Sequence, residues 1–121
     1  MIDLPIDRAV FDALVQMTGG DMDFVDELVH TFLEDGIEQV GALRAAVAAS
    51  DMAALGRPAH SLKSSSFNLG AMELGELCKE LEQLARLNVV VDAPARVHSI
   101  AAGFDRAREA LLAERAMRRA G

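Results

Sequence analysis

Apolar residues recur at every third or fourth position along most of the 121-residue sequence, which is the period of an amphipathic α-helix. Short segments rich in Gly, Ser, Asp or Pro interrupt this period, and such residues end one helix and cap the next. The pattern therefore predicts one short and four long helices, at residues 7–18, 21–49, 52–69, 71–87 and 95–117.

Helices joined by short loops pack as antiparallel neighbours. We therefore expect an all-α fold, an antiparallel up-down-up-down four-helix bundle with a short extra N-terminal helix as a lid. Residues 1–121 should form one domain with a frayed tail at 118–121, and 88–94 should be a short β-rich connection. Gly36 could bend the second helix, and Pro58 should kink or restart the third.

Each expected helix carries apolar residues on one face, and this face should point into the bundle. The stripes are Val10, Phe11, Leu14 and Met17 in the first helix, Phe24, Leu28, Phe32, Val40, Leu43 and Val47 in the second, and Leu74, Leu77, Cys78, Leu81 and Leu84 in the fourth.

The charge and composition exclude several classes of function. The formal net charge is −7, so nucleic acid and anionic membranes would repel the chain. A single cysteine, Cys78, allows no internal disulfide, and its place on an apolar face predicts burial. The start of the sequence does not resemble a signal peptide, and no uncharged run is long enough to cross a membrane, so we expect a cytoplasmic protein.

The most informative segment surrounds His60 in the third expected helix. Five small or apolar side chains share one helix face, and His60 lies about 130° away from the centre of that face. His60 should therefore be exposed on the flank of the helix, with Lys63 and Ser64 one turn further along. The residues of the buried face are Leu55, Ala59, Leu62, Ser66 and Leu69.

An exposed histidine beside a cation is suited to phosphoryl transfer. A neutral imidazole is a good nucleophile near neutral pH, and Lys63 could neutralise charge on the transferred oxygens. The sequence contains neither a Walker-type nor a kinase glycine loop, so no nucleotide site is visible. Ser61 follows His60, where many self-phosphorylating histidines are followed by an acid.

These residues resemble the signature of the histidine-containing phosphotransfer (HPt) family, in which Lys follows the histidine at the third position. The resemblance extends from about Leu4 to Arg86 and is specific in aggregate. The matching residues are Gly19, Gly20, Asp21, Phe24, Glu27, Leu28, Phe32, Leu33, Glu34, Asp35, Ser50, Asp51, His60, Lys63, Ser65, Leu69, Gly70, Ala71, Leu74, Leu77, Cys78, Leu81, Glu82 and Arg86.

The resemblance implies a role for several residues. His60 would be the phospho-acceptor through its outer ring nitrogen, Lys63 would assist with the phosphoryl charge, and Arg86 would belong to the same environment. Ser64 departs from the family, which usually has Gly there, and it could hydrogen-bond near the imidazole or crowd some partners.

The resemblance also implies the partners. A receiver domain of a response regulator or hybrid sensor histidine kinase would pass its phosphoryl group from an aspartate to His60, and a second receiver aspartate would take it. The receiver would supply the metal ion, so this chain would need no cofactor, would not phosphorylate itself and would act as a monomer. Leu14, Met17 and Leu28 would either dock the receiver or belong to the core, and the same choice stays open for Phe67.

Three other classes of function compete with the relay carrier. The chain could be a binding module that docks receivers or kinases without transfer, which the Ser64 departure favours, or a plain helical bundle with an inert His60. A metal-dependent bundle enzyme would need two Glu-x-x-His motifs, and the sequence has a single one, from Glu27 to His30. His30 and Glu34 form only half a metal site, and His98 stands alone, so both histidines are expected to be surface or structural residues.

Overall fold

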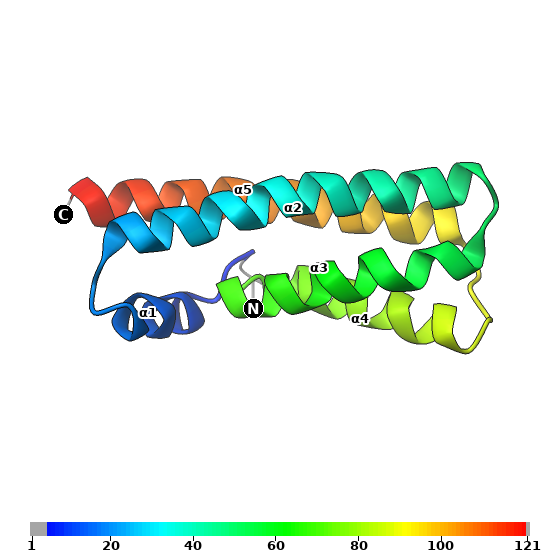
Figure 1. Cartoon of the computed structure of the whole chain (residues 1–121), viewed down its shortest axis with the longest axis horizontal. Helices are drawn as coiled ribbons and strands as arrows, with labels where there is room; N and C mark the ends of the chain where they lie inside the picture. The colour runs from blue at the N-terminus through cyan, green and yellow to red at the C-terminus, as the bar shows by residue number, and fades with distance from the viewer. Residues whose placement is uncertain (1–4, 121) are drawn as a thin grey trace.

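The structure of the chain, a computed structural model, describes residues 5–120. Residues 1–4, where the resemblance begins at Leu4, and Gly121 of the predicted tail lie outside the described part. Residues 5–120 contain helices and no strand, which confirms the all-α prediction. No helix in this range is both long enough and apolar enough to span a bilayer. The elements are α1 (Arg8–Met17), α2 (Met22–Ala48), the 3₁₀ turn η1 (Met52–Leu55), α3 (Gly56–Leu69), α4 (Met72–Arg86) and α5 (Ala93–Ala120) (Figure 1).

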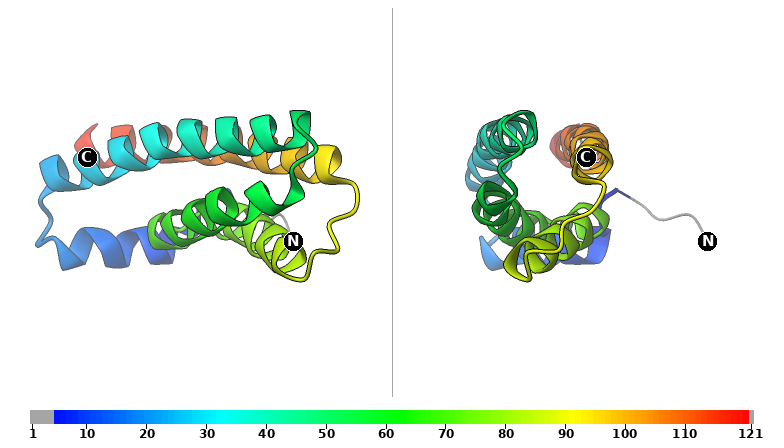
Figure 2. Two further views of the ribbon diagram at one scale, coloured as in Figure 1. Left: turned by 45° about the vertical axis from the view of Figure 1, so that its right-hand side comes forward. Right: turned by 90° about the vertical axis from the view of Figure 1, so that its right-hand side faces the viewer.

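Helices α2 to α5 form the expected antiparallel bundle, in which each helix runs opposite to the one before it (Figure 1). Around the bundle α2 packs on α3, α3 on α4, and α5 closes the ring against α4 and α2 (Figure 2). Helices α2 and α5, with 27 and 28 residues, are about twice as long as α3 and α4, with 14 and 15. Helices α2 and α5 extend beyond the ends of α3 and α4, and α1 lies below this extension (Figure 1). Helix α1 therefore continues the layer of α3 and α4 and does not form the expected lid.

The two ends of α5 differ from the sequence prediction. The helix begins at Ala93, two residues early, with Pro94 in the first turn, where its missing N–H has no helical partner to lose. It continues to Ala120, although we expected an end at Met117 and a frayed tail at 118–121. Arg118 and Arg119 explain the longer helix, because they form ion pairs with Asp12, Asp23 and Asp26 of α1 and α2.

The third predicted helix divides into two parts. Asp51 caps η1 by accepting a hydrogen bond from the Ala54 N–H at 3.2 Å, and α3 then starts at Gly56. Pro58 therefore stands in the first turn of α3, where an N–H is not needed for the helical ladder. The expected restart near Pro58 is confirmed, and it falls two residues before the proline.

The buried face of α2 was predicted correctly in its second half and wrongly near its start. Phe24 is 48% exposed and Leu28 is only half-buried, whereas Val25 and Val29 are fully buried. Both pairs are apolar and both have helical spacing, so the period alone could not select between them. The exposed Phe24 and the half-buried Leu28 leave apolar surface on the outside of α2.

Gly36 has a packing role at the centre of α2. A Cβ at this position would lie 2.1 Å from the ring of Phe104 in α5, so only glycine lets the two helices approach this closely. The Phe104 ring also packs against Phe32, with 5.7 Å between the ring centroids. Gly36 thus fixes the contact between the two longest helices.

Candidate functional site

His60 lies on α3 with its side chain 59% exposed. The opposite face of α3 is buried, as the spacing predicted, and this face forms the contact with the rest of the bundle. The buried face consists of Ala59, Leu62, Ser66 and Leu69 of α3, and Leu55 at the end of η1 continues it. The exposed position of His60 on the flank of the bundle is therefore confirmed.

Glu82 of α4 is the centre of the polar contacts around His60. Its side chain is only 7% exposed, yet three basic groups reach its carboxylate. Oε2 contacts Nδ1 of the His60 imidazole and lies 3.4 Å from Nη2 of Arg86. Oε1 accepts a hydrogen bond from Nζ of Lys63 at 2.5 Å. One buried carboxylate thus joins the predicted histidine, lysine and arginine.

The charge state of Glu82 decides which ring nitrogen of His60 carries the hydrogen. The hydrogen bond from the Lys63 ammonium lowers the pKa of Glu82 below its ordinary value of 4.5, and the contact with His60 acts in the same direction against burial. An ionised carboxylate only accepts hydrogen bonds, so Nδ1 of His60 must carry a hydrogen. In the neutral ring the free lone pair is then on Nε2, the outer nitrogen.

Lys63, Arg86 and Ser64 differ in exposure. The Lys63 side chain is 23% exposed and bound to Glu82, whereas that of Arg86 is 72% exposed and only at the edge of the cluster. Ser64 is exposed on the turn that follows His60. The structure thus brings three of the four predicted chemical residues to one carboxylate, while Ser64 lies beside the histidine on the outer surface.

An open groove of about 570 Å³ begins one turn beyond the histidine. All four predicted docking residues line it: Leu14, Met17, Leu28 and Phe67. The groove joins segments that are far apart in the sequence. Its walls are Val10, Ala13, Leu14 and Met17 of α1, Leu28, Thr31, Phe32 and Asp35 of α2, and Ser65, Phe67, Asn68 and Leu69 of α3.

Phe67 combines the two roles that the sequence left open. It is half-buried, and its ring packs so closely over Gly75 of α4 that a Cβ there would lie 2.5 Å from the ring. The same side chain lines the groove. Phe67 therefore helps to hold α3 on α4 while it also contributes to the apolar surface.

Sequence reasoning placed Glu82 in the matching pattern and gave it no role in the site. A signal was present, because Glu82 follows the buried Cys78 by one helical turn and so lies on the inner side of α4. A carboxylate at such a position needs partners to compensate its lost hydration. A search for basic residues on the neighbouring helix would have found His60 and Lys63.

The other titratable candidates lie elsewhere. His30 pairs with Glu34 at 2.6 Å on the exposed side of α2, and His98 is exposed on α5. Residues 5–120 hold no cluster of three or more His, Cys, Asp or Glu side chains suited to a metal ion. Cys78 is buried as predicted, and this burial raises the pKa of its thiol to about 12.

An exposed histidine on the flank of a four-helix bundle is the arrangement expected from the resemblance to phosphotransfer domains, and comparison with known proteins agrees. The model of the Hpt domain family matches residues 11–113. The chain therefore belongs to the Hpt family, whose members are histidine phosphotransfer intermediates of two-component signalling.

Two relatives support this assignment. The crystal structure of histidine-containing phosphotransfer protein B (HptB) from Pseudomonas aeruginosa PAO1 is 34% identical, with a TM-score of 0.84 over 93% of this chain and 96% of that one. Multistep phosphorelay regulator 1 of Schizosaccharomyces pombe is 30% identical over 83 residues, or 68% of this chain. The match spans 28% of the length of the yeast protein.

Proposed function

We propose that His60 accepts a phosphoryl group from the aspartate of one receiver domain and passes it to the aspartate of another. The observation that carries this proposal is the contact between Glu82 and Nδ1 of His60, because it leaves Nε2 as the nucleophilic nitrogen of an exposed ring. Membership of the Hpt family supports the same role. Response-regulator receivers and a hybrid sensor histidine kinase are the partners of this reaction.

The bonds that change in the transfer are few. The lone pair of Nε2 attacks the phosphorus atom of the aspartyl phosphate, an N–P bond forms, and the P–O bond to the aspartate breaks with its electrons leaving on the carboxylate. Because Nδ1 keeps its hydrogen, the ring gains positive charge as the bond forms. The ionised Glu82 lies beside Nδ1 and stabilises this charge. Transfer to the second receiver reverses these steps.

Lys63 supports the phosphoryl group in this mechanism. Its ammonium has three hydrogens and uses one for Glu82 at 2.5 Å, so others can bond to the phosphoryl oxygens. Arg86 adds positive charge from the edge of the cluster. Ser64, being small and exposed, leaves room for the receiver and influences which receivers fit closely.

The role proposed for this chain is that of a phosphoryl carrier without autokinase activity. The sequence lacks a nucleotide-binding loop, and the chemistry above needs no cofactor held by this chain. The receiver brings the metal ion that offsets the phosphoryl charge. We further propose that the protein acts as a monomer in the cytoplasm.

We place the docked receiver over the groove next to His60. The groove offers apolar surface from Leu14, Met17, Leu28 and Phe67 at the edge of the reacting histidine. Burial of this surface on binding provides affinity, while the nearby imidazole faces the aspartyl phosphate. A rigid arrangement of this kind places the two reacting groups without a large change of shape.

The test is transfer from phosphorylated receivers of the source genome to the wild-type chain, His60→Gln and His30→Gln. His30 is the matched control, because it is also exposed on a helix and also contacts a carboxylate. We expect rapid labelling of wild type and His30→Gln and none of His60→Gln. Circular dichroism should show that all three are folded.

Three results would contradict the proposal or a part of it. Label that persists on folded His60→Gln would mean that another residue is the acceptor. Failure of every receiver to label the wild-type chain, with binding retained, would favour the alternative of a docking module without transfer. Label acquired from ATP by the purified chain alone would contradict the absence of autokinase activity.

A further inference from the structure

Helix α1 forms one wall of the groove, yet few of its side chains are buried. Phe11 is its only buried residue, and Met17 near its end is 83% exposed. Just before the helix, the Asp7 N–H donates a hydrogen bond to the Gly70 carbonyl at 2.8 Å, which attaches this end to the α3–α4 turn. The far end leads into Gly19 and Gly20, both with positive φ. Besides Phe11, the half-buried Leu14 and Val15 pack against the core, so contacts outside the core have more weight in holding α1 than they have for α3.

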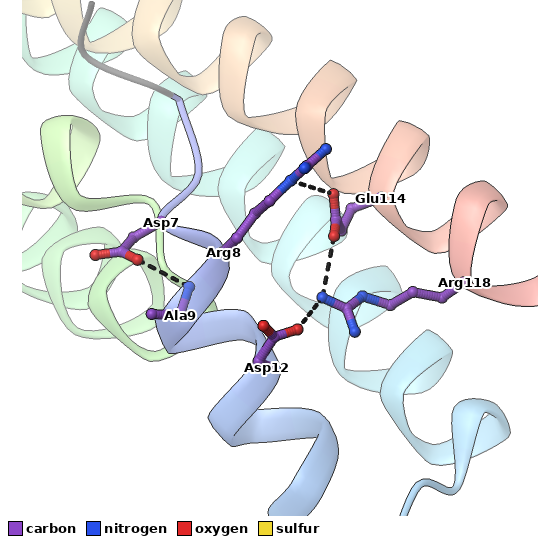
Figure 3. A network of polar contacts seen from close by, with 6 residues as sticks. All are labelled: Asp7, Arg8, Ala9, Asp12, Glu114 and Arg118. Atoms are coloured by element: carbon purple, nitrogen blue, oxygen red, sulfur yellow. Dashed lines mark hydrogen bonds and ion pairs between the residues drawn. The ribbon is translucent and has the colours of Figure 1, made fainter. Parts of the chain in front are cut away.

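The last turns of α5 supply such contacts (Figure 3). The guanidinium of Arg118 bonds to Asp12 of α1 and, at 3.0 Å, to Glu114 of its own helix. It also lies over the Phe11 ring, with Cζ 5.1 Å from the ring centroid. Arg8 of α1 completes the cluster with a 3.1 Å bond to Glu114, whose side chain is only 10% exposed.

The two faces of α1 have different neighbours. Residues 8, 11 and 12 point to α5, and the groove residues 10, 13, 14 and 17 lie on the opposite side of the helix. Arg118 itself does not line the groove. Any influence of Arg118 on the groove must therefore pass through the position of α1.

We propose that Arg118 is a positioning residue for receiver docking, because it clamps α1 to α5 and so sets the α1 wall of the groove. This inference rests on the proposed docking at the groove. It separates the residues that do the chemistry, which are on α3 and α4, from a distant residue that controls how well the partner is held. Loss of the clamp should weaken docking and leave the chemical step at His60 unchanged.

The experiment compares Arg118→Gln, Asp12→Asn and the double variant with wild type. Arg106→Gln is the matched control, since Arg106 also stands on α5 and forms a 2.7 Å ion pair, but with Glu73 of α4. Hydrogen exchange read by mass spectrometry reports on residues 8–17. Transfer is measured against the concentration of the receiver that labels wild type fastest in the panel described above.

We expect faster exchange in residues 8–17 for Arg118→Gln and Asp12→Asn, with α3 and α4 unchanged. The receiver concentration at half-maximal rate should rise about fivefold, as one partly buried charged contact would give, at an unchanged saturating rate. The double variant should be no worse than Arg118→Gln, because that substitution already removes the contact with Asp12. Arg118→Lys should restore part of the effect, since lysine keeps the charge without the planar fork.

Unchanged exchange in residues 8–17 would show that Arg118 does not hold α1 and would overturn the inference. A loosened α1 with unchanged half-saturation would also overturn it, because α1 would then not matter for docking. A fall of the saturating rate alone would assign Arg118 to the chemical step instead. If no receiver labels wild type, the proposed function and the docking part of this inference both fail, while the exchange data still decide whether the clamp exists.

Discussion

Helices α3 and α1 contribute neighbouring walls to one groove, but they are held in very different ways. Of its 14 residues, α3 buries Pro58, Ala59, Leu62, Ser66 and Leu69, whereas α1 buries only Phe11 of its ten. Helix α3 is fixed by apolar packing on the bundle. Helix α1 is held by the buried Phe11 ring, by the half-buried Leu14 and Val15, and by a cluster of ion pairs at the end of α5.

This difference separates chemistry from recognition. His60, the proposed acceptor, needs an accurate position, and it stands on a helix whose other face is firmly packed. The proposed docking surface on α1 belongs to an element with fewer buried residues, and adaptable binding regions are usually drawn from such elements. Substitutions in the two helices should therefore have distinct effects.

The largest effect on stability is expected from Leu62→Ala in the buried face of α3. Loss of this side chain should lower the free energy of unfolding by about 2–5 kcal/mol, because a cavity remains in a packed core. Leu14→Ala, on the half-buried groove face of α1, should cost about 1 kcal/mol or less. Urea denaturation of both variants measures the contrast, and equal losses would contradict the distinction between the helices.

A smaller and pH-dependent effect is expected from Glu82→Gln. The pKa of Glu82 is lowered in the folded chain, mainly by Lys63, so its ionised form stabilises the fold above its ordinary pKa of 4.5. This contribution is lost as the pH falls through the lowered value. The stability advantage of wild type over Glu82→Gln should thus be larger at about pH 7 than at about pH 3.

Urea denaturation at the two pH values tests this sign. The same substitution should slow transfer to His60 by about tenfold or more, since a neutral amide no longer stabilises the charged ring. An equal difference in stability at both pH values would argue against an ionised Glu82 as the partner of His60 and Lys63.

The smallest effect on stability is expected from Met17→Ser at the open end of α1. The side chain is 83% exposed, so the free energy of unfolding should change by no more than about 0.5 kcal/mol. Receiver docking should nevertheless weaken a few-fold, because the groove loses apolar surface. A titration of transfer rate against receiver concentration detects this, and a stable variant with unchanged docking would remove Met17 from the docking surface.

The sequence predicted those features that depend on a single helix. The exposed flank position of His60 followed from the spacing of Leu55, Ala59, Leu62 and Ser66, and the structure agrees. The antiparallel order of the four long helices followed from the short loops between them. Both are local properties of the chain, which is why a pattern of residues could reveal them.

Features that depend on contact between helices could not be predicted in this way. The apolar period of α1 grouped Phe11 with Leu14 and Met17, yet Phe11 faces α5 while the other two face the groove. The end of α5 was expected to fray because it is the end of the sequence, but Arg118 and Arg119 have partners on α1 and α2. Likewise, the role of Glu82 depends on how α4 packs against α3.

The most direct test of the proposed mechanism is the position of the phosphoryl group on the histidine ring. Nitrogen-15 NMR of histidine-labelled chain, after phosphorylation by a receiver, distinguishes the two ring nitrogens. Because Glu82 holds Nδ1, the phosphoryl group should be on Nε2 of His60. A phosphoryl group on Nδ1 of His60, or on His30 or His98, would contradict the proposed role of Glu82 and the assignment of the acceptor.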